Sequence, residues 1–122
     1  RYTCFLKPDT QLDMMYMPDA IKASIDVMEA DPSRLVNRNA FNIAAMQFTP
    51  DQLAAAIKKH IPDFTIDYDV DPLRQGIADS WPKTIDDSAA RSEWGWQPRY
   101  DLAAMTIDML EKLSKRHRAG TL

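Results

Sequence analysis

Apolar residues change their spacing several times along the chain, and these changes predict alternating strands and helices. Short apolar runs and alternation of apolar with polar residues predict strands at residues 2–6, 14–17, 38–45 and 64–70. Apolar residues spaced three and four apart, preceded by helix-starting residues, predict helices that begin near residues 18, 49, 87 and 101. This mixture predicts an α/β fold with short strands and about four helices.

The ends of the predicted helices carry clear local signals. Thr49 is expected to cap the second helix, and Gln52 three positions later completes a capping box. Gly95 is expected to end the third helix in a left-handed turn. The apolar face of the first helix, which we expect to pack inward, carries Ile21, Ile25 and Met28.

Residues 72–82 follow no clean period, and we predict an irregular conformation for them. The stretch places Arg74, Asp79 and Trp81 within eight positions. A cation, a carboxylate and a large aromatic ring on an irregular segment suit the binding of a small polar ligand. These three residues are therefore the candidate site. The alternatives are an ion pair between Arg74 and Asp79 and a structural, buried role for Trp81.

Composition and charge restrict the classes of partner. Hydrophobic residues make up 45% of the 122 residues and charged residues 27%, as in ordinary globular domains, and the formal net charge is −3. The one basic cluster, residues 115–118, ends a predicted helix, so we expect no nucleic-acid binding. The sole cysteine, Cys4, fits a reducing compartment, and no run is long and apolar enough to cross a membrane. We expect a cytoplasmic protein without a membrane partner.

The sequence lacks several arrangements that carry catalysis. Its three glycines, at positions 76, 95 and 120, cannot build a glycine-rich phosphate loop. No tyrosine is followed four residues later by lysine, and no cysteine and histidine set has metal-binding spacing. We therefore predict no catalytic, cofactor-binding or metal-binding residue in this chain. Because the chain opens at Arg1, we expect it to be a piece of a longer protein.

Several strings of residues have the character of a family signature. Residues 14–20 read Met-Met-Tyr-Met-Pro-Asp-Ala, and residues 74–82 read Arg-Gln-Gly-Ile-Ala-Asp-Ser-Trp-Pro. Together with residues 4–10 they resemble the C-terminal part of L-threonine 3-dehydrogenases of the extended short-chain dehydrogenase type. The resemblance covers nearly the whole chain. Two further strings, at residues 41–43 and 94–96, are shared with sugar-nucleotide epimerases and dehydratases.

The resemblance implies a fold, a reaction and a place for this chain in both. It implies a Rossmann-type fold in which residues 1–122 form the C-terminal, substrate-side region and an absent N-terminal part binds NAD. The implied reaction is the oxidation of L-threonine to 2-amino-3-oxobutanoate by a homodimeric parent, with the isolated chain inactive. Trp81 would then pack on the substrate methyl group, Arg74 would hold its carboxylate, and Asp79 would orient Arg74.

Two other interpretations stay open at this point. The chain could come from an NAD-dependent sugar-nucleotide epimerase or dehydratase, in which an arginine near Arg74 would meet the diphosphate. It could instead be a non-enzymatic binding module that folds alone. If the chain comes from a threonine dehydrogenase or from an epimerase or dehydratase, we expect the predicted strand at residues 38–45 to belong to a larger sheet whose other strands lie outside this chain.

Overall fold

The computed structural model describes residues 1–38 and 40–121. Over these residues the chain forms the expected α/β fold, with short strands and one α-helix more than predicted. The strands are β1 (Tyr2–Cys4), β2 (Leu12–Met14), β3 (Met46–Phe48) and β4 (Ile66–Tyr68). The helices are α1 (Met17–Glu29), α2 (Pro50–Lys58), α3 (Pro72–Ser80), α4 (Ser88–Trp94) and α5 (Leu102–Arg118), with a short 3-10 helix at Pro32–Arg34.

The strands pair two by two. β1 runs parallel to β4, with Tyr2 opposite Ile66 and Cys4 opposite Tyr68. β2 runs antiparallel to β3, with its central residue, Asp13, opposite Gln47. Because side chains alternate along a strand, the four residues of the first pair point to one face of their sheet. That face bears most of the apolar residues of β1 and β4.

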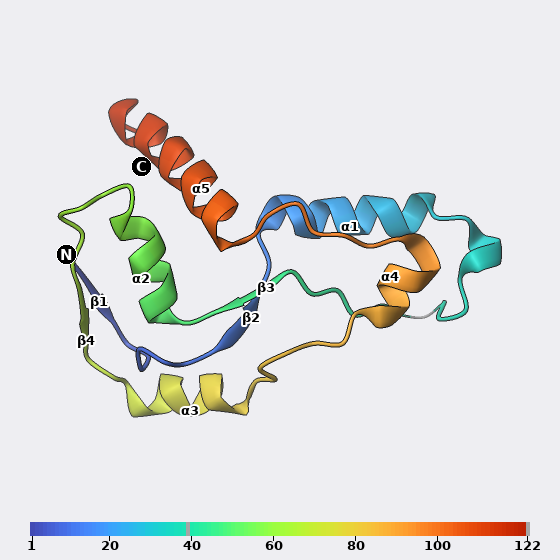
Figure 1. Ribbon diagram of the computed structural model, residues 1–122, viewed down its shortest axis with the longest axis horizontal. Helices are drawn as coiled ribbons and strands as arrows, with labels where there is room; N and C mark the ends of the chain where they lie inside the picture. The colour runs from blue at the N-terminus through green and yellow to red at the C-terminus, as the bar shows by residue number, and fades with distance from the viewer. Residues whose placement is uncertain (39, 122) are drawn as a thin grey trace.

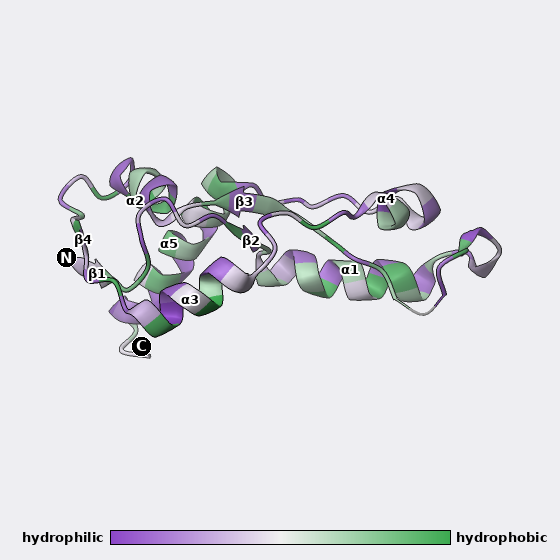
Figure 2. Ribbon diagram, turned by 90° about the horizontal axis from the view of Figure 1, so that it is seen from below, coloured by the Kyte–Doolittle hydropathy of each residue, from purple (hydrophilic) through white to green (hydrophobic). Residues whose placement is uncertain are grey.

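The molecule is elongated and flat. Figure 1 shows β1, β4, α2 and α3 at one end and α1 with α4 at the other, and Figure 2 shows the thin dimension. Two small apolar clusters hold the elements together. One forms around Trp96 and Ala23, and the other forms around Met46, Phe48 and Met105. Because neither cluster is large, many apolar side chains outside them remain accessible.

The predicted helix ends are confirmed. The Thr49 hydroxyl accepts the Gln52 backbone N–H at 3.3 Å, and the Gln52 side chain accepts the Thr49 N–H at 3.0 Å, which is a complete capping box. The Asp101 carboxylate caps α5 by accepting the Ala104 N–H at 2.8 Å. Gly95 ends α4 with a φ of 76°, a left-handed conformation that favours glycine.

The predicted inward face of α1 is wrong. Ile21, Ile25 and Met28 all lie on the exposed side, and Met28 keeps 76% of its surface accessible. The helix buries its opposite side, where Ala23 packs against Trp96. The spacing of apolar residues identifies a helix face suited to packing against another element. It does not reveal whether that element lies in the same chain.

The strand predicted at residues 38–45 is also wrong for this chain, because β3 begins only at Met46. Residue 39 lies outside the described residues. From residue 40 to 43 the exposure still alternates, with Phe41 and Ile43 half-buried on either side of the exposed Asn42, but Ala44 is buried and breaks the pattern. A strand requires a neighbour for its backbone hydrogen bonds. Among the described residues no strand pairs with this segment.

The side chain of Asp19 connects the start of α1 to the segment just before α5. It lies in the first turn of α1 and is fully buried. Its carboxylate accepts the backbone N–H of Arg99, 3.0 Å from each oxygen, and the N–H of Tyr100 at 3.0 Å. These donors lie just before α5, so one side chain ties the start of α1 to the start of α5. The positive end of the α1 dipole further stabilises the carboxylate.

We expect Asp19→Ala to lower the free energy of unfolding by about 3 kcal/mol, because two part-buried N–H groups lose a fully buried, charged acceptor. Urea unfolding followed by tryptophan fluorescence measures the loss. Asp26→Ala on the same helix removes a partner of Lys22 in a partly exposed pair and should cost less than about 1 kcal/mol. Equal losses in the two variants would contradict the role given to Asp19.

Candidate functional site

The stretch that we predicted to be irregular forms helix α3 instead. Asp71 caps it by accepting the N–H groups of Leu73 at 2.9 Å and Arg74 at 3.1 Å, and Pro72 occupies its first turn. The hydropathy pattern concealed the helix because one of its two buried positions is the polar Gln75. The signal that could have revealed it was the Asp-Pro start.

Gln75 fixes α3 against the loop after β1. Its side-chain oxygen accepts the backbone N–H of Lys7 at 2.9 Å, and its amide nitrogen donates to the Thr10 hydroxyl at 3.0 Å. The same nitrogen donates to the Asp79 carboxylate at 2.7 Å. Gln75 and Thr10 are both buried, so this network determines the direction in which Asp79 points.

Asp79 lines a small polar cavity of about 150 Å³. The cavity lies between α3 and the loop after β1, and its walls carry charges of both signs. The lining residues are Lys7, Asp9, Thr10, Gln11, Gln75, Ala78, Asp79 and Lys83. The two ammonium groups and two carboxylates give the wall the polarity that a small charged ligand requires.

Arg74 and Trp81 do not line this polar cavity. The Arg74 guanidinium lies 4.5 Å from the centre of the Phe5 ring, and its Nε lies 3.6 Å from the Asp71 carboxylate. The alternative ion pair between Arg74 and Asp79 is therefore wrong, because Asp71 is the partner. Trp81 ends α3 and keeps 56% of its surface exposed, so it is not a buried structural residue.

The three predicted site residues thus belong to one helix without meeting in the polar cavity, with Arg74 in its first turn and Asp79 and Trp81 at its C-terminal end. Arg74 and Trp81 are seven positions apart, which is close to two helical turns and favours one side of α3. Asp79 faces the polar cavity. A substrate-binding role for Arg74, Asp79 and Trp81 stays a prediction, and it requires further walls to complete a chamber around them.

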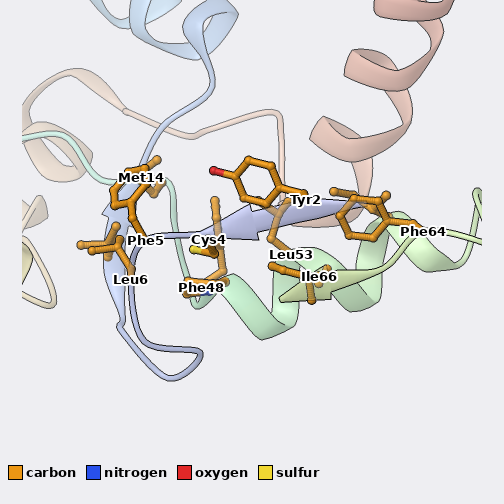
Figure 3. A pocket seen from close by; sticks show the side chains of 13 residues that line it. Tyr2, Cys4, Phe5, Leu6, Met14, Phe48, Leu53, Phe64 and Ile66 are labelled. Atoms are coloured by element: carbon orange, nitrogen blue, oxygen red, sulfur yellow. The ribbon is translucent and has the colours of Figure 1, made fainter. Parts of the chain in front are cut away.

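A second and larger hollow, which we call the apolar groove, lies on the other side of β1. Its volume is about 490 Å³. Figure 3 shows side chains from β1, the segment leading into β4, β3 and α2 gathered around it. The lining residues are Tyr2, Cys4, Phe5, Leu6, Leu12, Met14, Phe48, Pro50, Leu53, Ala54, Ile57, Phe64 and Ile66. No charged side chain is among them.

Tyr68 continues the groove-facing side of β4. Its phenol donates a hydrogen bond to the Asp51 carboxylate of α2. Burial, together with this bond to Asp51, raises the pKa of Tyr68 to about 12. At neutral pH the phenol is therefore protonated and links β4 to the first turn of α2.

The described residues contain neither a metal-binding cluster nor a glycine-rich phosphate loop. No three histidine, cysteine, aspartate or glutamate side chains among them gather in a way that could bind a metal ion. Cys4 is buried in the wall of the apolar groove, whose lining contains no basic side chain. Gly76 lies inside α3, and Gly95 and Gly120 follow helix ends. None of these glycines opens a helix, so the phosphate cradle of a dinucleotide site is not built here.

Comparison with known proteins identifies the class. No family model matches the chain. An uncharacterized epimerase/dehydratase of Staphylococcus haemolyticus is 54% identical over 118 residues, which cover 97% of this chain and 37% of that protein. The chain therefore spans little more than a third of the length of the curated relatives it matches.

Solved structures match equally well. A GalE-like L-threonine dehydrogenase from Cupriavidus necator is 55% identical with a TM-score of 0.87, covering 92% of this chain and 40% of that one. The L-threonine dehydrogenase of Clostridium difficile is 55% identical with a TM-score of 0.91, covering 94% of this chain and 36% of that one. The chain has the fold of the C-terminal part of Rossmann-type, GalE-like dehydrogenases.

Among such dehydrogenases, the L-threonine dehydrogenases are the proteins that it resembles in both sequence and structure, which confirms the predicted resemblance. The described residues also contain no helix with both the length and the apolar character to cross a membrane.

We expect the stability of the chain to fall as pH rises from about 10, the ordinary tyrosine value, to about 12. In that range the unfolded chain has released the Tyr68 proton and the folded chain still holds it. Urea unfolding at a series of pH values measures the slope. Tyr68→Phe should make the slope shallower, and Asp51→Asn should have a smaller effect because burial is the larger cause. An unchanged slope in Tyr68→Phe would contradict this assignment.

Proposed function

We propose that the chain is the substrate-side part of an NAD-dependent L-threonine 3-dehydrogenase, whose full-length form oxidises L-threonine to 2-amino-3-oxobutanoate. The observation that carries the proposal is the 55% identity, over more than nine-tenths of this chain, to the threonine dehydrogenases of Cupriavidus necator and Clostridium difficile. The signature strings at residues 14–20 and 74–82 lie within this chain and support the same assignment.

The chemistry of the reaction assigns a limited role to this chain. Oxidation of an alcohol requires a base that removes the hydroxyl proton and a nicotinamide that accepts the hydride. The described residues supply no phosphate cradle for NAD, so the cofactor and the base belong to the rest of the full-length protein. The contribution of this chain is to cover the substrate, exclude water and fix its orientation.

Helix α3 is the part of the chain suited to that role. Trp81 presents a rigid, accessible ring at the end of α3, and its indole can pack on the methyl group of threonine. Arg74 offers a guanidinium on the same side of the helix, held by Asp71 and Phe5. Asp79 is oriented by Gln75 and contributes a fixed negative charge nearby.

A second candidate function comes from the curated relatives. Their name is epimerase/dehydratase, and two of them are 54% and 53% identical to this chain. In such an enzyme Arg74 would meet the diphosphate of a sugar nucleotide. A substrate comparison separates this candidate from the first.

We expect a chimera to oxidise L-threonine when this chain replaces the matching part of the Cupriavidus necator enzyme. Turnover should stay within about a hundredfold of that of the unmodified enzyme, since small misplacements near a reacting centre change rates on this scale. Formation of reduced nicotinamide from L-threonine, compared with UDP-sugars, measures it. A soluble chimera that binds NAD but turns over only the sugar nucleotides would contradict the first candidate. The 122-residue chain alone should show neither turnover nor NAD binding by calorimetry.

In the same chimera, we expect Trp81→Ala to raise the KM for threonine about tenfold with a smaller change in kcat, because the ring contacts substrate before and during the reaction. Initial rates over a range of threonine concentrations measure both constants. Val36→Ala is the matched control, since Val36 is a highly exposed apolar residue at the other end of the molecule. Equal effects of the two substitutions would remove Trp81 from the site.

A further inference from the structure

The chain exposes more surface than a compact protein of its size. Its accessible area is 8463 Å². A folded monomer of 13.9 kDa is expected to expose about 6,700 Å². The excess of about 1,800 Å² is about twice the roughly 800 Å² that each partner buries in a standard protein–protein interface. The flat, elongated shape in Figures 1 and 2 is the visible cause of this excess.

The apolar groove is one part of this extra surface, and none of its lining residues is charged. Native cores contain few voids larger than one water molecule, about 30 Å³. The groove measures about 490 Å³ and is open to solvent along β1. In Figure 3, Tyr2 and Phe64 stand at one end and Met14 with Leu6 at the other. Leu53 of α2 lies between them, behind β1.

The chemistry of the groove excludes a small polar substrate. Threonine and sugar nucleotides carry charges that need polar partners when they leave water. The groove lining has no charged group, and its one hydroxyl, on Tyr2, lies on a half-exposed residue. Apolar walls of this extent are typical of a surface that another protein segment covers.

We propose that the apolar groove is the docking site for an apolar helix face from the part of the full-length protein outside these 122 residues. The amount of absent chain supports this occupant, because the Staphylococcus haemolyticus relative extends well beyond the 37% of its length that this chain matches. The geometry favours a helix. The groove runs beside α2 along the face of the β1–β4 sheet, and sheet faces are completed by helices packed side by side at 8–10 Å.

A second copy of this chain fits the groove less well. A two-fold contact would place groove against groove, and two concave surfaces cannot fill each other. An occupant with a convex apolar ridge is required. The proposal needs only that the rest of the protein folds against this chain, and it is independent of whether the substrate is threonine.

Cys4 provides a local reporter for the cover, because it is the only cysteine of the chain and its side chain lines the groove with 7% of its surface still accessible. The rate of alkylation of Cys4 by iodoacetamide, read by mass spectrometry of the peptide, is compared between the 122-residue chain and the chimera with the Cupriavidus necator enzyme. We expect alkylation to be at least about tenfold slower in the chimera, because the covered thiol reacts only after local opening.

Two matched substitutions make the test specific. Tyr2→Lys places a charge at the rim of the groove and should restore fast alkylation in the chimera, whereas Val36→Lys adds the same charge far from the groove and should leave it slow. Equal rates in chain and chimera, equal effects of the two lysines, or an insoluble chimera would overturn the proposal. So would a chain that sediments as a dimer and protects Cys4 by itself, since the occupant would then be a second copy. If Cys4 is alkylated slowly in a chimera that does not turn over threonine, the proposed cover of the apolar groove is supported and only the proposed reaction is rejected.

Discussion

The carboxylate of Asp19 is the constraint on which the arrangement of the chain depends. A buried charge is costly unless it is fully hydrogen-bonded, and Asp19 meets this condition with the N–H groups of Arg99 and Tyr100. Because those groups precede α5, the bond sets where α5 starts relative to α1. Tyr100 then packs edge-on against Tyr16 at 5.0 Å, and the second apolar cluster forms beside them. The position of α5 thus follows from one side chain in the first turn of α1.

Local signals made parts of this fold predictable from the sequence. The capping box of Thr49 and the left-handed Gly95 depend only on residues within one turn, and both are as predicted. Predictions that depend on tertiary partners were less successful. The strand expected at residues 38–45 and the inward face expected for α1 are both wrong, because no strand among the described residues pairs with that segment and the apolar face of α1 is exposed. A period reveals which side of an element is apolar, and only the fold reveals what covers it.

The candidate site was likewise predictable from the sequence only in part. Residue types drew attention to Arg74, Asp79 and Trp81, and the resemblance to threonine dehydrogenases gave them a context. Their spatial relation followed from α3, whose buried side uses Gln75 and therefore produces no hydropathy signal. The apolar groove could not be located from the sequence, because its walls come from segments that are far apart along the chain. The pairing of β1 with β4 and of β2 with β3 brings those walls together.

The pairing of β1 with β4 also constrains the order in which the chain can fold. Tyr2 lies opposite Ile66, so the first strand finds its only partner among the described residues after half of the sequence has followed it. Closing such a long loop lowers the conformational entropy of the chain before any stabilising contact forms. Helices α2 and α5, in contrast, can form from neighbouring residues. During synthesis the first strand therefore leaves the ribosome long before its partner exists. A helix already folded against its apolar side would shield it through that interval.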